Sequence, residues 1–468
     1  MPRESPGVAN STESVTRALA PVTPRERISS VDTIRGFSLL GILLMNILGF
    51  ALPGNAYDDP TIAGGATGIN LATWVVTYLL VEGKMRTIFS MLFGAGVVLL
   101  TSRLEERGGE GRIGDIYYRR TLWLLAFGLV HAYFLWPGDI LYFYAVAGLM
   151  LFPFRKLSAK HLILAGVLVL AVLVPKRILL GLEMQSLREK AAAADAAAAA
   201  GKTLTEEQRE NQKKWAEKLK EIKPPASEIE KEIADHRAGY WKLFLRRQEE
   251  VSRGESVGFY RWGFFDSAGM MLLGMALLKL GFFSAARSYR EYALIALVGY
   301  ALGLSINTYV AYRNIQNHFD VAGTAFHWNA YGLLNWTAYD VERLAVALAH
   351  VAVVMMICKA GALTWLTSRL ATVGQMALSN YLTHTIVCTI VFDGYGFGLF
   401  GRFQRFQIYG VVLAIWIFQL ILSKIWLSHF RFGPVEWLWR SLTYWKRQPM
   451  RLLGMPPVPQ GAAAGLAD

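Results

Sequence analysis

The chain has 468 residues, 54% of them hydrophobic, and carries a formal net charge of +13. Several apolar runs of about 18–25 residues are long enough to cross a bilayer, which excludes a set of ordinary soluble domains. The basic excess is typical of cytoplasmic loops in a membrane protein, so we expect no nucleic-acid partner. The two cysteines, Cys358 and Cys388, lie inside apolar runs without metal-ligand spacing, and the sequence predicts neither a disulfide framework nor a metal site.

The apolar runs predict an all-α fold, a polytopic transmembrane bundle of about ten spans. The expected spans lie near residues 34–52, 70–101, 121–136, 140–154, 160–182, 262–283, 291–311, 341–360, 370–392 and 408–427. The second run is too long for one simple crossing and is interrupted by Glu82-Gly-Lys84-Met-Arg86, so we expect a re-entrant or interfacial helix joined to a span. Gly94 and Gly96 in this run allow close helix packing.

Shifts in composition divide the chain into five segments. They are a disordered cytoplasmic tail (1–26), an N-terminal transmembrane half (27–182), a charged helical insert (183–256), a C-terminal transmembrane half (257–447) and a second disordered tail (448–468). The insert holds fifteen Lys or Arg and fifteen Asp or Glu, and we expect solvated helices in it. Lys and Arg in the short connections fall on one side, which places both termini in the cytoplasm and the insert outside.

Charged residues stand at the mouth of the first span, where Arg27, Asp32 and Arg35 precede the apolar run and Asn46 lies within it. Charges at the edge of hydrocarbon are costly and usually have a function. The alternative is anchoring, in which Arg35 extends to lipid headgroups and Asp32 caps the helix N-terminus. Asn46 would then only hold two helices together.

A histidine and a carboxylate flank the Pro-Gly turn after the third span. His131 lies near the outer end of that span, and Asp139 follows eight residues later at the same expected depth. A carboxylate beside a histidine fixes its tautomer and raises its basicity, which is what a general base requires. The alternative is a histidine that is hydrogen-bonded to backbone at the membrane interface.

Other polar residues in the apolar runs are rival site residues. Asn380 and His384 share one helix face, and with Asn46 and His327 they are candidates for lining a substrate cavity. We expect His350, among Ala and Val, to be a satisfied histidine inside the bundle.

The polar motifs of both halves resemble the YeiB-like membrane protein family with its C-terminal domain of unknown function. This family is akin to heparan-α-glucosaminide N-acetyltransferase-like transmembrane acyltransferases. The resemblance covers most of residues 27–447 and is carried by Arg-x-x-Ser-x-Asp-x-x-Arg-Gly at 27–36, Gly128-Leu-Val-His131, Gly138-Asp139, Gly374-Gln-Met-Ala-Leu-Ser-Asn380 and Gly433-Pro434-x-Glu436-Trp437.

The resemblance implies a multi-pass acyltransferase of the bacterial inner (cytoplasmic) membrane. An acyl-CoA co-substrate would bind from the cytoplasm, and its acyl group would reach a hydroxyl or amine acceptor outside. His131 would be the base or a transient acyl carrier, and Asp139 its orienting partner. The residues expected to hold the CoA are Arg27, Asp32, Arg35, Lys84, Arg86, Arg119 and Arg120. Some relatives pair, so a homodimer is possible, and no permanent cofactor is expected.

Two other functions remain open on the sequence. A transporter or lipid flippase would use the buried polar residues as its pathway, and would need alternating gates. A non-catalytic envelope assembly protein would bind a partner through the insert and would tolerate loss of His131.

Overall fold

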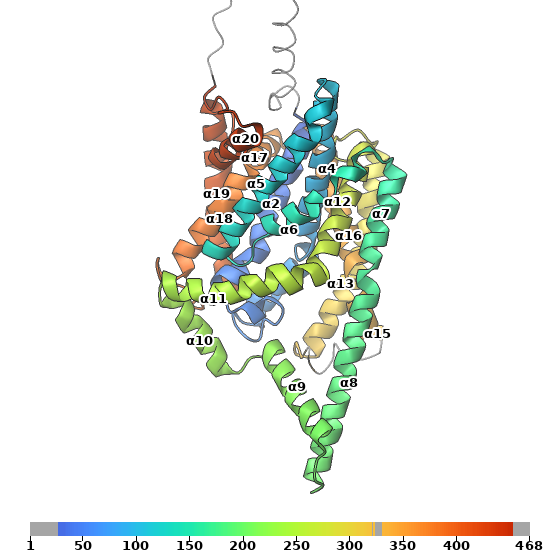
Figure 1. The fold of residues 1–468 in the computed structure, drawn as a ribbon, viewed down its shortest axis with the longest axis vertical. Coiled ribbons are helices and arrows are strands. Elements are labelled where there is room, and N and C mark those ends of the chain that lie inside the picture. Colours follow the sequence, from blue (N-terminus) through green and yellow to red (C-terminus); the bar gives the residue numbers. More distant parts are fainter. Residues whose placement is uncertain (1–26, 321, 323–329, 453–468) are drawn as a thin grey trace, which may run out of the picture.

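The computed structural model describes residues 27–320, 322 and 330–452, which form an all-α bundle (Figure 1). Extended pairing in these residues is limited to one bridge between Phe430 and Arg451. The helices run in this order: α2 (Ser29–Ala51), α3 (Gly68–Leu80), α4 (Lys84–Glu106), α5 (Ile113–Phe134), α6 (Leu141–Leu149), α7 (Ala159–Ala171), α8 (Leu173–Ala199), α9 (Glu206–Ile222), α10 (Ala226–Arg237), α11 (Tyr240–Arg253), the π-helical η5 (Gly254–Gly263), α12 (Phe264–Lys279), α13 (Tyr289–Gln316), α15 (Ala330–Thr337), α16 (Tyr339–Ala360), α17 (Thr364–Gln375), α18 (Ala377–Phe392), α19 (Arg405–His429) and α20 (Pro434–Tyr444).

The predicted all-α membrane fold is confirmed. Six helical stretches of the described chain are long and apolar enough to cross a membrane: Ser29–Ala51, Gly68–Glu106, Ala159–Ala199, Tyr289–Gln316, Tyr339–Ala360 and Arg405–His429. The helices α5, α6, α12 and the pair α17–α18 occupy the other predicted spans. Of these, α6 has 9 residues and is about 14 Å long, too short to cross a bilayer alone. The count of ten spans therefore stays a prediction.

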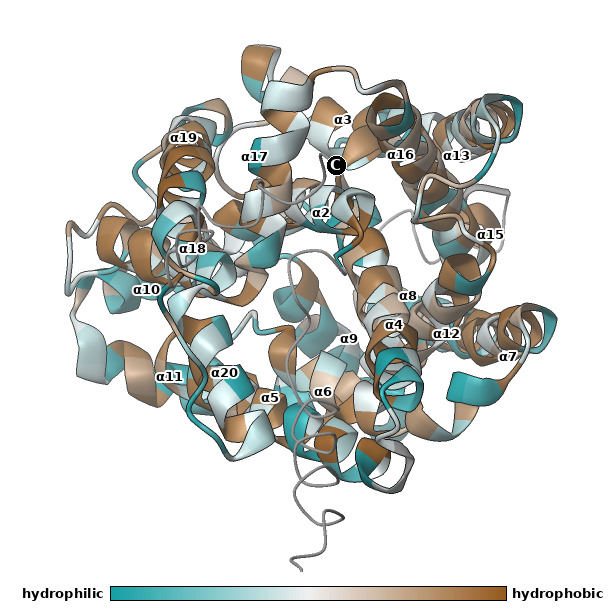
Figure 2. Cartoon of the chain, turned by 90° about the horizontal axis from the view of Figure 1, so that it is seen from above, coloured by the Kyte–Doolittle hydropathy of each residue, from teal (hydrophilic) through white to brown (hydrophobic). Residues whose placement is uncertain are grey.

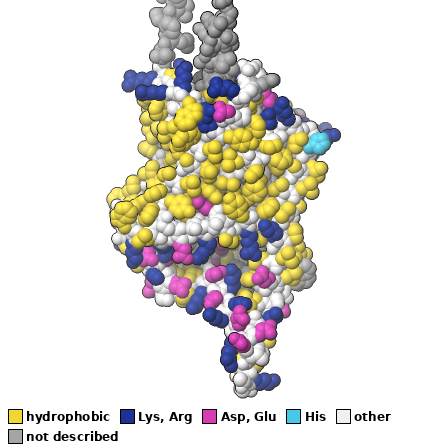
Figure 3. Space-filling model, viewed as in Figure 1, with side chains coloured by type: hydrophobic (Ala, Val, Ile, Leu, Met, Phe, Trp, Pro, Cys, Tyr) yellow, Lys and Arg dark blue, Asp and Glu magenta, His cyan; other side chains and the backbone are white. Residues whose placement is uncertain are grey.

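The surface is divided into zones along the long axis of the molecule. Figure 3 shows a broad hydrophobic belt between an end rich in Lys and Arg and an opposite end of mixed charge. The peripheral helices α7, α13 and α19 (Figure 2) carry exposed apolar side chains, such as Leu168, Leu297 and Leu413. The described chain begins and ends at the Lys/Arg-rich end (Figure 1). This polarity agrees with the expected cytoplasmic location of that end, although the orientation itself stays a prediction.

Helices of the two predicted halves interleave, so the halves are not separate bodies. The helices α4 and α12 cross at Gly94 and Gly274, where an added Cβ would lie 1.9 Å from a backbone oxygen of the other helix in each case. The helices α2 and α17 cross in the same way at Gly36 and Gly374, with 2.0 Å to backbone oxygen on either side. Such close backbone contact requires glycine. It joins the N-terminal half to the C-terminal half at two crossings.

The charged insert is helical and lies at the mixed-charge end (Figure 1). There α8 projects beyond the bundle and packs against α9, while α11 lies across the bundle's end. Buried contacts tie the insert to the loop after α18: Arg247 pairs with Asp393 at 2.7 Å, and His236 lies 3.0 Å from the same carboxylate. The insert therefore caps the bundle.

Most of the two predicted tails lies outside the described residues. The N-terminal tail (1–26) lies outside them completely, and so do residues 453–468 of the C-terminal tail. Residues 448–452 are ordered, because the amide of Arg431 donates to the Met450 carbonyl at 2.9 Å. The boundary at 447 and the disordered tail after it stay predictions.

Candidate functional site

A cavity of about 260 Å³, here called the basic cavity, lies inside the Lys/Arg-rich end between α2, α4, α5, α18 and α20. Its walls are mainly apolar, with Leu92, Phe93 and Leu124 among them, and Tyr144 and Tyr381 line its inner part. Five arginines also line it: Arg27, Arg35, Arg103, Arg120 and Arg440. An apolar chamber with guanidinium groups near its mouth suits a ligand with an anionic head and an apolar tail.

Asp32 positions two of these arginines. Its carboxylate accepts hydrogen bonds from Arg35 at 2.7 Å and from Arg27 at 3.3 Å. The alternative of a helix cap is wrong, because Ile28 occupies the N-cap position of α2 and no side chain caps it. The acids in the lining are Asp32 and Glu436, so the five arginines leave the cavity with a net positive charge. Anions are therefore attracted to this end of the bundle.

Arg120 and its neighbour Arg119 differ in direction. Successive residues of a helix are turned by about 100° from each other, so Arg120 faces the basic cavity while Arg119 does not line it. Arg119 donates to the Thr443 carbonyl at 3.0 Å and pairs with Asp115 instead. Arg119 therefore does not line this cavity, and its contact with CoA stays a prediction.

Lys84 and Arg86, also predicted as CoA ligands, do not line the basic cavity either. The expected interruption of the second apolar run is a turn at Gly83, whose φ of +69° favours glycine. Because α4 starts at this turn, the two bases lie at the opposite end of α4 from Arg103 and nearer the mixed-charge end of the bundle. The sequence indicated the break but not its depth.

His131 and Asp139 meet across the Pro-Gly turn as expected. The distance from Nδ1 of His131 to Oδ1 of Asp139 is 2.7 Å, and the second carboxylate oxygen accepts the backbone amide of Tyr142 at 2.7 Å. The other ring nitrogen, Nε2, lies 2.8 Å from Oγ1 of Thr385 on α18. All three side chains of this Asp–His–Thr relay are buried. The carboxylate fixes one histidine nitrogen and leaves Nε2 to exchange a proton with a hydroxyl group.

The relay lies directly beyond the inner part of the basic cavity. The ring of Tyr381, which lines the cavity, is 5.2 Å from the ring of His131 between centroids. Tyr381 and Thr385 are one turn apart on α18 and so lie on the same face.

A carboxyl group of η5 also influences the relay. Burial and the charge of Asp139 raise the pKa of Glu255 to about 7. The charge next to the relay therefore changes near neutral pH.

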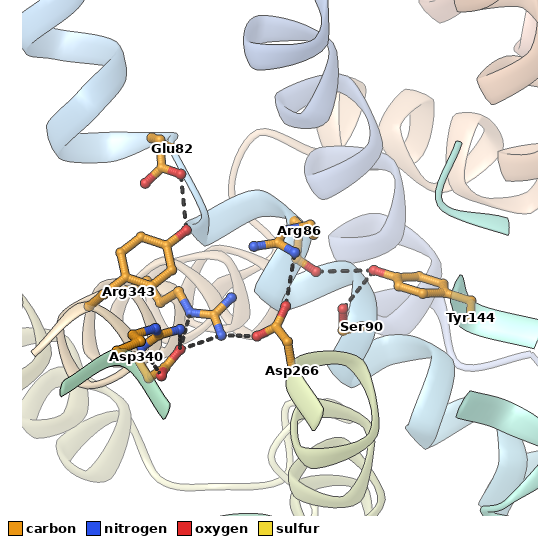
Figure 4. A network of polar contacts seen from close by, with 9 residues as sticks. Glu82, Arg86, Ser90, Tyr144, Asp266, Asp340 and Arg343 are labelled. Atoms are coloured by element: carbon orange, nitrogen blue, oxygen red, sulfur yellow. Dashed lines mark hydrogen bonds and ion pairs between the residues drawn. The ribbon is translucent and has the colours of Figure 1, made fainter. Parts of the chain in front are cut away.

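A network of buried charges lies between the helices α4, α12 and α16 (Figure 4). Asp266 accepts from Arg86 at 2.9 Å and also pairs with Arg343. Arg343 contacts Asp340 at 2.7 Å, one turn away on α16. Asp266 is thus buried in the bundle and pairs with two bases. Buried charges are tolerated when each has a partner of opposite sign.

Tyrosines connect this network to its surroundings. The Tyr144 hydroxyl, from the basic cavity, lies 2.7 Å from the Ser90 hydroxyl and donates to the Arg86 carbonyl at 3.2 Å (Figure 4). The Tyr339 hydroxyl donates to Glu82 at 3.0 Å. The network thus extends from the basic cavity to Glu82, which faces a second cavity.

The second cavity, here called the acidic cavity, has a volume of about 350 Å³. Its lining comes from α2, the loop after α2, α3, α13, α15, α16 and α19, and consists of Met45, Tyr57, Asp58, Trp74, Thr77, Tyr78, Glu82, Asn314, Phe319, Asn335, Tyr339 and Arg405. The bundle therefore holds a basic cavity at one end and an acidic, aromatic cavity beyond the charge network.

Comparison with known proteins identifies the family. Over 434 residues the chain is 32% identical to "Uncharacterized protein YeiB" of Escherichia coli (strain K12), which covers 89% of this chain and 96% of that protein. The chain belongs to the YeiB-like family. It is also 27% identical over 448 residues to "Uncharacterized protein YxaH" of Bacillus subtilis (strain 168), covering 92% of this chain and 98% of the relative.

A family model described as "Protein of unknown function (DUF418)" matches residues 277–446, so the expected C-terminal domain of this YeiB-like chain is confirmed. No solved structure matches the chain. The bacterial relatives and the apolar helices indicate a membrane protein. Neither the family model nor the relatives carry the name of an activity.

Three of the predicted cavity residues of this YeiB-like protein, Asn46, Asn380 and His384, line neither cavity. Asn380 donates to Ser423 of α19 at 3.0 Å, and His384 lies 2.8 Å from Gln419 of the same helix. These side chains join α18 to α19, which is a structural role. Asn46 is half-buried and absent from both linings, although its neighbour Met45 faces the acidic cavity. His327 lies outside the described residues.

Several residues of the site were not expected from sequence. Thr385 is one residue beyond His384, but no motif marks a lone threonine in an apolar helix as a partner for His131. Asp340 and Arg343 could have been predicted as a pair, because an acid and a base three residues apart lie on the same helix face. Paired charges at the start of an apolar span are a candidate buried network.

Proposed function

We propose that the protein is an integral membrane acyltransferase that moves an acyl group from cytoplasmic acyl-CoA to a hydroxyl or amine acceptor outside the inner membrane. The observation that carries the proposal is the arginine-lined basic cavity, whose inner part ends at Tyr381 next to the Asp139–His131–Thr385 relay. Arginines match phosphate geometry, and apolar walls match an acyl chain.

The donor would bind with its phosphates at Arg27, Arg35 and Arg120, all of which line the cavity. The volume of about 260 Å³ is near the lower end for ligand sites, which are roughly 300–1,000 Å³. It would hold the thioester arm and the acyl group, while the nucleotide stays at the mouth.

His131 would act as the base in the transfer. Its Nε2 takes the proton of the acceptor hydroxyl or amine, whose oxygen or nitrogen attacks the thioester carbonyl carbon. The carbon–sulfur bond breaks as the new carbon–oxygen or carbon–nitrogen bond forms, and the CoA thiolate leaves with the proton that His131 held. Asp139 keeps the imidazole in the required tautomer, and Thr385 holds Nε2 until the acceptor replaces it.

The test compares neighbouring arginines in the full chain, purified in a nonionic detergent. Binding and hydrolysis of acetyl-CoA and of palmitoyl-CoA are measured for the wild type, Arg120→Gln and the matched control Arg119→Gln. Losing a charge-assisted phosphate contact weakens binding by about tenfold. We expect this loss in Arg120→Gln but not in Arg119→Gln, because only Arg120 lines the cavity.

The relay is tested in the same preparation. His131→Ala should still bind the donor but release no acyl group, and Thr385→Val should bind it normally with altered turnover. If the wild type binds neither donor, the acyl-CoA proposal is wrong. Equal weakening by both arginine variants would instead mean a general charge effect rather than a site.

A transporter or lipid flippase is the second candidate, favoured by the buried charge network between the two cavities. Transporters use such ion pairs as gates that open toward one side at a time. Reconstituted vesicles that accumulate a substrate without acyl-CoA, with loss of accumulation in Arg86→Gln, would favour this function.

A further inference from the structure

The walls of the acidic cavity are aromatic on several sides. Trp74 and Tyr78 stack with ring centroids 4.7 Å apart, and Phe319 meets Trp74 edge-on at 4.9 Å. Tyr57 and Tyr339 line the same space. Aromatic faces attract organic cations through their quadrupoles, most strongly where water is excluded. The cavity therefore offers surfaces that favour a positively charged ligand.

The charges in and behind the cavity wall leave one carboxylate in excess. The acids are Asp58, Asp59, Glu82, Asp266, Asp340 and Glu342, and the bases are Lys84, Arg86, Arg177, Arg343 and Arg405. The bases behind the wall are held by carboxylates of the network, such as Lys84 by Glu342 at 3.2 Å. In the described part of the chain, no hydrogen bond or ion pair engages the Asp58 carboxylate, although it lines the cavity.

Arg405 is a buried donor in the lining of the acidic cavity. Arg405 is 1% exposed and donates to the Ala56 carbonyl, but its Nε has no hydrogen-bond partner within the described residues. A buried N–H normally meets an acceptor, and leaving it unpaired is costly. A ligand that brings an oxygen atom would satisfy Arg405 while its cationic part faces the acids.

We propose that the acidic cavity binds a small organic ammonium compound that also carries an oxygen atom, held between Asp58, Glu82 and the aromatic walls. A metal ion fits this cavity less well, because aromatic carbon supplies much of the lining and hard cations require several oxygen ligands. Among the described residues there is also no group of three or more His, Cys, Asp or Glu that could hold a metal. The excess of one carboxylate matches a single positive charge.

This site does not depend on the proposed acyltransferase function. The acidic cavity lies on the far side of the charge network from the basic cavity and the relay at His131, so its ligand is not the acceptor from which His131 takes a proton. A transporter would bind the same cation.

The test uses choline and its neutral isostere, 3,3-dimethyl-1-butanol, which differ in charge but hardly in shape. The full chain is purified in a maltoside, which carries no ammonium headgroup, and binding is measured calorimetrically. We expect choline to bind at least about tenfold more tightly. Asp58→Asn should remove most of this preference, whereas Glu210→Gln, an exposed acid of the insert, should keep it. Glycerophosphocholine serves as a third ligand, and tighter binding than choline would identify a lipid headgroup as the source of the cation.

The wild-type comparison needs no variant, so misfolding of Asp58→Asn cannot obscure the answer. Equal affinity for choline and its isostere, or no binding of either, would overturn the cation site. A choline preference that survives in Asp58→Asn would do the same. Acetyl-CoA binding is measured on the same sample: if the donor binds and choline does not, only this inference fails. If choline binds and neither acyl-CoA does, the cation site stands and the acyltransferase function fails.

Discussion

Asp266 is the centre of the buried charge network, and Asp266→Asn should destabilise the protein strongly. The substitution keeps the shape of the side chain but removes the charge that faces Arg86 and Arg343. Breaking a buried ion pair costs about 3–5 kcal/mol because the remaining charge stays uncompensated. The Arg86 side chain is 40% exposed, so water screens its part, and Arg343 keeps Asp340 as a partner. We therefore expect about 3 kcal/mol, the lower end of the range.

Thermal unfolding in detergent measures this effect against a matched control. Glu249→Gln removes one partner of an ion pair with Arg253, whose side chains are 79% and 74% exposed, respectively. Such a surface pair contributes about 0.5 kcal/mol or less. The Asp266→Asn variant should unfold several degrees below both the wild type and the control. A midpoint equal to that of Glu249→Gln would refute the argument that the network is a coupled and buried set of charges.

Three further predictions follow from packing, titration and topology. Gly94→Val should abolish the monodisperse peak in size-exclusion chromatography, because its Cβ would lie 1.9 Å from a backbone oxygen of α12, whereas Gly96→Ala has open space and should elute like the wild type. Choline affinity should rise several-fold from about pH 5 to about pH 7, because burial and the charges of Glu82 and Asp59 raise the pKa of Asp58 to about 6. Only the ionised form of Asp58 attracts the cation, so the affinity of Asp58→Asn should not change over this pH range. Cysteine introduced at Ala197 in the insert should react with a membrane-impermeant maleimide in intact cells, whereas labelling only after lysis would reverse the predicted orientation.

Local sequence signals predicted the parts of the site that depend on neighbouring residues. The Pro-Gly turn brought His131 and Asp139 together, since eight residues around a hairpin return the chain to the same depth. Thr385 was not predictable in this way, because it lies 254 residues from His131 and its approach depends on the packing of α18 against α5. The different directions of Arg119 and Arg120 were also not predictable. The sequence places both at the membrane edge, and only the rotation of the helix decides that Arg120 faces the cavity.

Long-range packing also explains why the sequence predicted the all-α fold but not the contacts between the two transmembrane halves. The length of a hydrophobic run indicates a helix whatever that helix packs against, so the all-α bundle could be predicted from the apolar runs. The glycine contacts that cross the two halves, such as Gly36 with the backbone of α17, cannot be read from the motif. A glycine in a span indicates close packing but does not name its partner.

The charge network has a different consequence for each of the two candidate functions. A charged substrate that crosses from one cavity to the other would compete with pairs such as Arg86–Asp266, and opening a buried pair costs about 3–5 kcal/mol. An acyl group is neutral and apolar, and it would only have to displace side chains such as Tyr144 or Tyr381 at the inner part of the basic cavity. The ion pairs can then stay closed and keep ions from leaking while the acyl group is transferred. The arrangement of a basic cavity, a closed charge network and an acidic cavity therefore favours transfer of a neutral group over passage of a charged solute.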